Sequence, residues 1–207
     1  MLKKNYFYAL PYYEFQSNSL LIDEINKDLL DSDKLYENPN TYNQSLRTKN
    51  YQNFYNENFY EWVINCLFSI KKDLFIPSTL ELVITDCWIN KTSKLQGHHI
   101  HTHPNSFLSG IFYLTSHISA KTSFIFDNYW YDSLHLFNIP KPPIEIQITP
   151  EAGKMILFPS HIKHKVSALT SDEIRYSVSF NVFFSGTFST ENGTMLTIST
   201  NSIKSSV

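Results

Sequence analysis

Residues 175–181 read Arg-Tyr-Ser-Val-Ser-Phe-Asn, and this stretch decides the fold class. Its polar and apolar residues alternate, which is the period of a β-strand whose two faces meet different surroundings. The face expected to pack in a hydrophobic core carries Tyr176, Val178, Phe180 and Val182. The opposite face carries Arg175, Ser177, Ser179 and Asn181. The pattern therefore predicts a strand that lies between a core and a polar cavity.

Short segments of the same kind fill much of the second half of the chain. Each is rich in Ile, Val, Phe or Tyr and is bounded by Pro, Gly, Asn or Asp, which is typical of strands joined by turns. The predicted strands are 80–90, 109–115, 122–126, 144–148, 154–158, 164–169 and 175–184. Asn192-Gly193 is a typical hairpin turn and predicts a further strand over 195–198.

The first third of the chain has a different pattern. Apolar residues recur at helical spacing over 19–30 and again over 58–74, and Pro77 ends the second helix. Residues 31–53 are rich in Asp, Asn, Ser and Tyr and are expected to form loop. The aromatic stretch 7–15 is expected to be an edge strand, an arm exchanged between two copies, or ordinary core.

Helices followed by a run of short strands predict an α+β fold. Its main body is expected to be a double-stranded jelly-roll or a barrel, with N-terminal flanking helices. We expect a single domain over 1–207. Within it, 1–78 would be a helical N-terminal support, 79–185 the jelly-roll core and 186–207 a C-terminal hairpin and tail.

Composition excludes several classes of function. The chain has 207 residues and a formal net charge of −2, so it offers no basic surface for long nucleic acid. No run of about 18 apolar residues occurs, so no membrane span is expected. Two cysteines, Cys66 and Cys87, are too few for a disulfide framework. Because the N-terminus shows no secretory signal, these features predict a cytoplasmic protein.

Four of the eight histidines fall within residues 98–103, in the stretch His-His-Ile-His-Thr-His followed by Pro104. On a strand, side chains alternate faces, so His99, His101 and His103 are expected to share one side. Neutral imidazole is the commonest transition-metal ligand, and His164 is the best candidate for a ligand from elsewhere in the chain. The alternative is a solvated polar loop without a metal.

Arg175 extends the metal hypothesis, because its strand is expected to border the cavity that His164 also borders. A guanidinium there offers a planar fork that binds a carboxylate through two hydrogen bonds. The alternative is a surface ion pair with Asp172 or Glu173. The long segment 127–143, with Tyr129-Trp130-Tyr131, is expected to be either a lid over the cavity or a loop packed on the body.

Taken in order, these residues resemble the 2-oxoglutarate/Fe(II) oxygenases of bacteria and phages. The resemblance covers roughly residues 80–182 and is carried by the order and spacing of five motifs. They are Trp88-x-Asn90, His101-x-His103-Pro104, Ser109-Gly110-x-x-Tyr113-Leu114, Phe158-Pro159-Ser160 and Arg175-x-Ser177-x-Ser179-Phe180-Asn181. The N-terminal third carries no such motif.

The resemblance implies a double-stranded β-helix, a cupin-like jelly-roll, that holds Fe(II). It also implies 2-oxoglutarate as co-substrate and O2, with ascorbate as an accessory reductant. It implies hydroxylation of a substrate carbon with release of succinate and CO2. By position it assigns the metal ligands to His101, His103 and His164. It assigns the binding of 2-oxoglutarate to Arg175, Ser177, Tyr113 and Asn90.

One position departs from the pattern of the wider superfamily, which uses two histidines and one carboxylate. Here His103 occupies the carboxylate position, so the ferrous ion would keep its full charge until the co-substrate binds. We therefore expect weak resting metal affinity that depends on 2-oxoglutarate. Two other ligand sets stay open: His99 with His101 as the pair, or a carboxylate supplied by Asp127.

Two rival functions also fit the residues. One is a cupin-like enzyme with three histidine ligands that does not use 2-oxoglutarate. The other is a jelly-roll binding or structural protein without catalysis. The expected partners are a small-molecule or side-chain substrate and, for the aromatic stretch 7–15, a second copy of the chain. Long nucleic acid and membrane are not expected.

Overall fold

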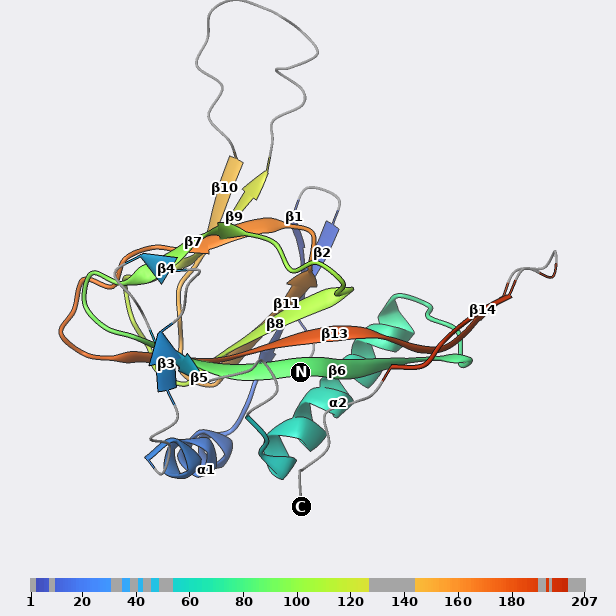
Figure 1. The fold of residues 1–207 in the computed structure, drawn as a ribbon, viewed down its shortest axis with the longest axis horizontal. Helices are drawn as coiled ribbons and strands as arrows, with labels where there is room; N and C mark the ends of the chain where they lie inside the picture. Colours follow the sequence, from blue (N-terminus) through green and yellow to red (C-terminus); the bar gives the residue numbers. More distant parts are fainter. Residues whose placement is uncertain are drawn as a thin grey trace, which may run out of the picture.

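A computed structural model describes residues 3–7, 10–30, 35–37, 41–42, 46–48, 54–126, 144–189, 193 and 195–200. Two helices and fourteen strands lie in these ranges (Figure 1). In chain order they are β1 (Lys3–Phe7), β2 (Leu10–Gln16), α1 (Ser19–Leu30), β3 (Leu35–Glu37), β4 (Thr41–Tyr42), β5 (Leu46–Thr48), α2 (Glu57–Asp73), β6 (Leu80–Thr92), β7 (Gly97–His101), β8 (Leu108–Tyr113), β9 (Thr122–Phe126), β10 (Ile144–Ile148), β11 (Lys154–Pro159), β12 (Lys163–Val166), β13 (Arg175–Ser189) and β14 (Met195–Ile198).

The strands form two antiparallel sheets. The larger has the order β1-β2-β11-β8-β13-β6-β5-β3, with β14 paired to β13, and the smaller has the order β10-β9-β12-β7-β4. The two sheets lie across from each other in Figure 1, with β7 and β12 on one side and β6 and β13 on the other. This arrangement confirms the predicted α+β class and its jelly-roll core.

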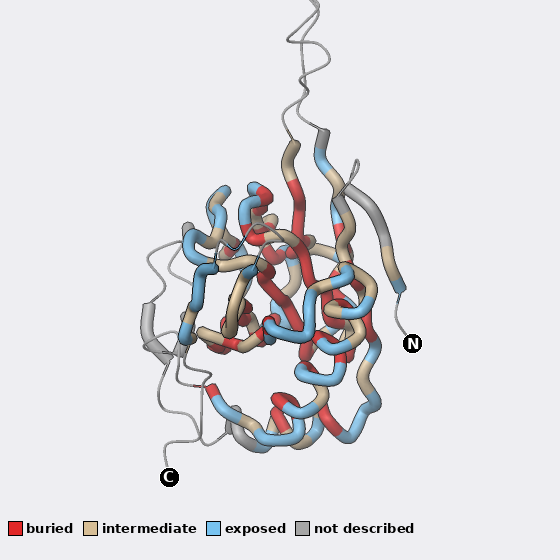
Figure 2. The backbone as a smooth tube through the Cα atoms, turned by 90° about the vertical axis from the view of Figure 1, so that its right-hand side faces the viewer, coloured by how far each residue is buried: buried red, intermediate tan, exposed pale blue. Residues whose placement is uncertain are grey.

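Strand β13 has the two faces that its sequence predicts. Val178, Phe180 and Val182 are fully buried in the main core, on the side of the sheet covered by α2. Phe59 of α2 contacts the ring of Phe180, with 6.0 Å between centroids. The opposite face of β13, which begins at Arg175, lines a cavity between the sheets. In Figure 2 the buried residues accordingly concentrate along the strands and on one side of the helices.

Helix α2 confirms the predicted helix over 58–74 to within one residue at each end. Asn56 caps it, since its side-chain oxygen accepts a hydrogen bond from the backbone N–H of Phe59 at 2.9 Å. The buried stripe consists of Phe59, Tyr60, Val63, Cys66, Leu67 and Ile70. Helix α1 spans 19–30, as predicted.

The first 78 residues supply strands as well as the predicted helices, and an edge strand near the N-terminus was one of the predicted alternatives. Strand β2 pairs with β11, and β1 pairs with β2, so the aromatic stretch near the N-terminus includes an edge of the larger sheet. Strands β3, β4 and β5 lie within 31–53, where we expected loop. Each has two or three residues and pairs onto an existing sheet, so tertiary context rather than local pattern decides its conformation. The turn residue Asn192 lies outside the described residues.

Within the described ranges, neither helix has the length and apolar character needed to cross a bilayer.

Close packing leaves no room for a side chain at Gly110 of the Ser-Gly motif. Gly110 pairs with Phe180 across β8 and β13, and a Cβ at this position would lie 2.1 Å from Cζ of that ring. Phe180 is fully buried against α2 and cannot retreat. We therefore expect Gly110→Ala to destabilise the protein by about 1–3 kcal/mol in urea unfolding. Adding Phe180→Leu to this variant should recover part of the loss, and an unchanged midpoint for the single variant would contradict the argument.

Candidate metal centre and co-substrate pocket

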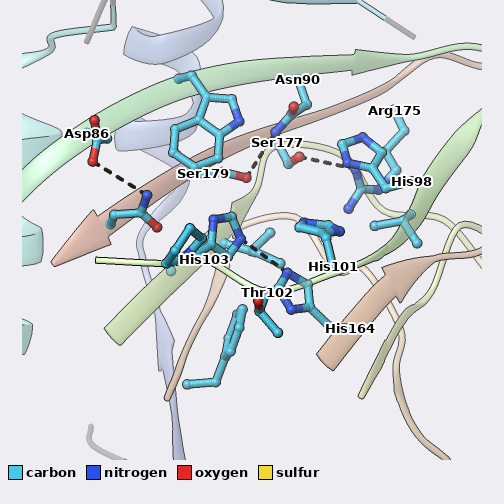
Figure 3. A pocket seen from close by; sticks show the side chains of 17 residues that line it. Asp86, Asn90, His98, His101, Thr102, His103, His164, Arg175, Ser177 and Ser179 are labelled. Atoms are coloured by element: carbon cyan, nitrogen blue, oxygen red, sulfur yellow. Dashed lines mark hydrogen bonds between the residues drawn. The ribbon is translucent and has the colours of Figure 1, made fainter. Parts of the chain in front are cut away.

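A cavity of about 460 Å³ lies between the two sheets and collects most of the predicted site residues (Figure 3). Strands β6 and β13 line it from the larger sheet, and β7 and β12 line it from the smaller one. The residues that line it from these strands, and from the segment just after β7, include Asp86, Trp88, Asn90, His98, His101, His103, His164, Arg175, Ser177, Ser179 and Asn181.

Strand β7 contains a β-bulge that decides which histidines face the cavity. His164 of β12 pairs with His101, but Val166, two residues later, pairs with His98, three residues earlier. The extra residue on β7 interrupts the alternation of side chains. His98 and His101 therefore both line the cavity, whereas His99 is exposed. The prediction that His99, His101 and His103 share one side is wrong for His99.

His101, His103 and His164 form a compact cluster. One ring nitrogen of each lies within 4.8 Å of the other two. His101 and His164 are direct cross-strand neighbours, and His103 follows the end of β7, where its backbone N–H donates to the carbonyl of Ser160 at 3.0 Å. The Nε2 atoms of His103 and His164 are 3.2 Å apart.

Hydrogen bonds fix the tautomers of two of these rings. Nδ1–H of His101 donates to the carbonyl oxygen of His99 at 2.7 Å, and Nδ1–H of His164 donates to that of Ile162 at 2.9 Å. Each Nε2 therefore presents a lone pair to the cluster, as metal-bound histidines do. Burial lowers the pKa of His103 to about 4, and burial followed by the neighbouring imidazoles lowers the pKa of His164 well below its usual value. The cluster is thus neutral at pH 7.

This donor set fits a divalent transition metal. Two nitrogens bound at about 2.1 Å in neighbouring positions of one ion lie about 3.0 Å apart, close to the spacing of His103 and His164. Imidazole nitrogens are suitable ligands for iron. In the described part of the chain, no carboxylate joins this cluster. Asp127 and the rest of 127–143, including the predicted lid, lie outside the described residues.

Arg175 lies at one end of the cavity and is 1% exposed. Its Nη1 donates to Oγ of Ser177 at 3.1 Å, and its buried Nε has no hydrogen-bond partner. Among the described residues, no carboxylate forms an ion pair with it; Asp172, the alternative partner, pairs instead with Lys94 at 2.9 Å. Burial lowers the pKa of Arg175, although a guanidinium stays protonated at neutral pH. A buried cation without a counter-ion is the chemistry of a site for an anionic ligand.

The structure places the two remaining co-substrate candidates differently. Asn90 lines the cavity, and its Nδ2 donates to Oγ of Ser179 at 2.9 Å. Tyr113 lies behind Arg175 rather than in the cavity lining: its ring is 5.5 Å from the guanidinium carbon, and its hydroxyl donates to Thr122 at 2.8 Å. The cation–π contact with Tyr113 helps to hold Arg175, and a direct contact of Tyr113 with the co-substrate stays a prediction.

Two residues that line the cavity, Asp86 and His98, were not predicted from the sequence. Asp86 precedes Trp88 and Asn90 by one and two strand periods, so alternation on β6 was the signal that could have identified it. No sequence pattern identifies His98, because the β-bulge that turns it into the cavity is not visible in the sequence. Its Nε2 is buried without a partner, and burial with the nearby Arg175 lowers the pKa of His98 to about 3.

Comparison with protein families gives one match. Residues 86–181 match the family described as "Putative 2OG-Fe(II) oxygenase". The matched range contains all the site residues discussed above. Among curated proteins, no sequence matches the chain.

Several solved structures share the fold. A Pseudomonas putida prolyl-4-hydroxylase is 14% identical, with 82% of this chain and 91% of that chain covered and a TM-score of 0.55. HygX from Streptomyces hygroscopicus, solved with nickel and 2-oxoglutarate, is 11% identical, with 87% and 84% covered and a TM-score of 0.60. The α-ketoglutarate-dependent epimerase SnoN from nogalamycin biosynthesis is 11% identical, with 84% and 78% covered and a TM-score of 0.61. At these identities the similarity establishes the double-stranded β-helix fold alone.

Proposed function

We propose that this chain, whose residues 86–181 match the 2OG-Fe(II) oxygenase family, is such an oxygenase and that its cavity residues have the following roles. His101, His103 and His164 hold the ferrous ion. Arg175 and Ser177 bind the distal carboxylate of 2-oxoglutarate. The observation that carries this assignment is a neutral three-histidine cluster beside a buried guanidinium without a counter-ion.

Bound iron supplies the oxidising chemistry of the family, which consumes 2-oxoglutarate and O2 and releases succinate and CO2. The residues of the chain bind and orient the reactants. The Nδ1 hydrogen bonds to His99 and Ile162 keep the Nε2 lone pairs of two ligands directed at the metal. Tyr113 keeps the guanidinium in place, and Ser177 accepts a hydrogen bond from its Nη1–H. The buried Nε–H is left to donate to a carboxylate.

His98 adds a second polar group beside Arg175. Because the imidazole is neutral, one of its ring nitrogens carries a hydrogen that can be donated to the same carboxylate. Asn90 and Ser179 complete the polar wall between the co-substrate end and the metal. The proposed co-substrate contacts are thus Arg175, Ser177, His98 and, from the neighbouring strand, Asn90.

The rival without 2-oxoglutarate leaves the buried Arg175 without a counter-ion among the described residues, so the pocket favours the oxygenase. A binding or structural protein without catalysis would not need the three histidine lone pairs to converge.

We further propose that the enzyme acts in the cytoplasm on a small molecule or a side chain, and that 1–207 forms one domain. A homodimer through the N-terminal edge of the larger sheet stays a prediction.

We expect the purified protein, supplied with Fe(II), ascorbate and 2-oxoglutarate, to release succinate slowly without any added substrate. Uncoupled turnover follows because the metal and co-substrate sites are complete without a primary substrate. Succinate is quantified by mass spectrometry, with an N-oxalylglycine-inhibited sample as the control. Absence of succinate together with absence of anaerobic 2-oxoglutarate binding would contradict the proposed function.

A further inference from the structure

The cavity has a second charged end, which the proposed function does not use. Asp86 lies at the end opposite Arg175, with the histidine cluster between them (Figure 3). Among the described residues that line the cavity, Asp86 is the acidic one and Arg175 the permanently charged base. No ion pair within the described ranges involves Asp86. The cavity therefore carries a positive charge at one end and an uncompensated negative charge at the other.

A local irregularity of β6 accompanies Asp86. Asn181 of β13 pairs with Asp86, but the next residue, Val182, pairs with Ile84. Thr85 is the extra residue of a β-bulge, a device that redirects side chains near functional sites. Its hydroxyl donates to Oδ2 of Asp86 at 2.9 Å. The extra residue of the bulge thus holds the carboxylate in place.

A chain of hydrogen bonds supports the carboxylate from behind. Nδ2 of Asn181 donates to Oδ2 of Asp86 at 3.5 Å, and Ser109 donates to Oδ1 of the same asparagine at 3.0 Å. The hydroxyl of Ser160 lies 2.9 Å from that of Ser109. Both serines are buried and cannot exchange these bonds for water. Both contacts of Asp86 use Oδ2, and no hydrogen bond within the described ranges occupies Oδ1.

Trp88 lies between this carboxylate and the metal ligands. Its ring centroid is 5.9 Å from that of His103, and Asp86 precedes it by one strand period, about 7 Å along β6. An indole face beside a carboxylate is a favourable site for an organic cation, since both groups attract positive charge. A neutral or anionic group would leave the half-buried carboxylate without compensation.

We propose that Asp86 and Trp88 bind the cationic group of the primary substrate, a protonated amine or a guanidinium, and so present a neighbouring carbon to the metal. This inference rests on the proposed function, because it takes the Arg175 end as the co-substrate site. It restricts the substrate class to basic compounds: a lysine-like or arginine-like side chain, or a small amine.

The test compares cationic probes with a neutral probe of similar length on the intact protein. The protein is loaded anaerobically with Mn(II) and 2-oxoglutarate, and probe binding is measured by calorimetry. The probes are the Nα-acetyl methylamides of lysine, arginine and norleucine. We expect the lysine or arginine probe to bind about tenfold more tightly than the norleucine probe. Asp86→Asn should remove this preference, whereas Asp172→Asn, an exposed acid that pairs with Lys94, should keep it.

Three results would overturn the proposal: equal binding of all three probes, no saturable binding of either cationic probe, or a preference that survives Asp86→Asn. If the Asp86→Asn protein folds poorly, which its thermal melt would show, the comparison of the probes on the wild type still tests the proposal. The loading step separates the two proposals. Failure of 2-oxoglutarate to bind the wild type rejects the proposed function, whereas normal loading without charge preference rejects the substrate class alone.

Discussion

Arg175→Met is expected to weaken 2-oxoglutarate binding by about thirtyfold or more, while the metal-free protein keeps or gains stability. Loss of one partner of a buried charge pair costs about 2–5 kcal/mol, and about 1.4 kcal/mol corresponds to a factor of ten. In the metal-free protein, by contrast, the guanidinium is buried with a serine and an aromatic ring as partners and without a counter-ion. Replacing such a charge with an apolar side chain of similar length is often neutral or stabilising.

Anaerobic calorimetry with Mn(II) measures the loss of affinity, and urea unfolding measures the stability. Lys94→Met is the matched control, because Lys94 forms an ion pair with Asp172 on the surface and should change neither quantity much. An Arg175→Met protein that binds 2-oxoglutarate as the wild type does would remove the basis for the co-substrate site. A large loss of metal-free stability would instead show that the guanidinium stabilises the fold.

His103→Ala and His164→Ala are expected to lose stoichiometric metal, whereas His99→Ala is expected to keep it. Each of the first two changes removes one of three ligands, so the loss of affinity should exceed the 10- to 100-fold loss typical of residues that merely support a ligand. His99 is exposed, and its contact with the ligand His101 is through a backbone carbonyl that alanine also provides. The three variants therefore distinguish the two ligand pairs that the sequence left open.

Metal content after gel filtration, determined by mass spectrometry, measures the effect. It is measured with and without 2-oxoglutarate, because three neutral ligands leave the charge of the ion uncompensated and should make retention depend on the dianion. Metal loss in His99→Ala with retention in His103→Ala would establish the His99 and His101 pair instead. Full retention in His164→Ala would remove the distal ligand from the site.

The helices and most strands could be predicted because their patterns are local. On β13, apolar and polar residues alternate over seven positions, and on α2 the apolar residues recur over 17 residues. Burial on one face enforces both patterns. Strands β3, β4 and β5 could not be predicted, since two or three residues carry too little pattern and pair only where a sheet edge is already present.

The candidate site could be predicted where it uses residue types that seldom cluster in a sequence and that follow one another in a distinctive order. Four histidines in six positions, a distant histidine and an arginine on an amphipathic strand indicate a metal and an anion. Side-chain direction was less predictable, because it depends on strict alternation, which the bulges at His99 and Thr85 interrupt. His98 lines the cavity because of the first bulge, whereas Asp86 shares one face of β6 with Trp88 and Asn90. Tyr113 lies behind Arg175.

By itself, the sequence determined the jelly-roll class, the resemblance to the oxygenase family and the kinds of groups that carry the chemistry, because periodicity and motif spacing are properties of the linear chain. The tertiary structure decided which nitrogen atoms converge, that no described carboxylate pairs with Arg175, and that a carboxylate occupies the far end of the cavity. These features arise where two sheets face each other across the cavity. Register, bulges and burial, which depend on strands distant in sequence, fix them there.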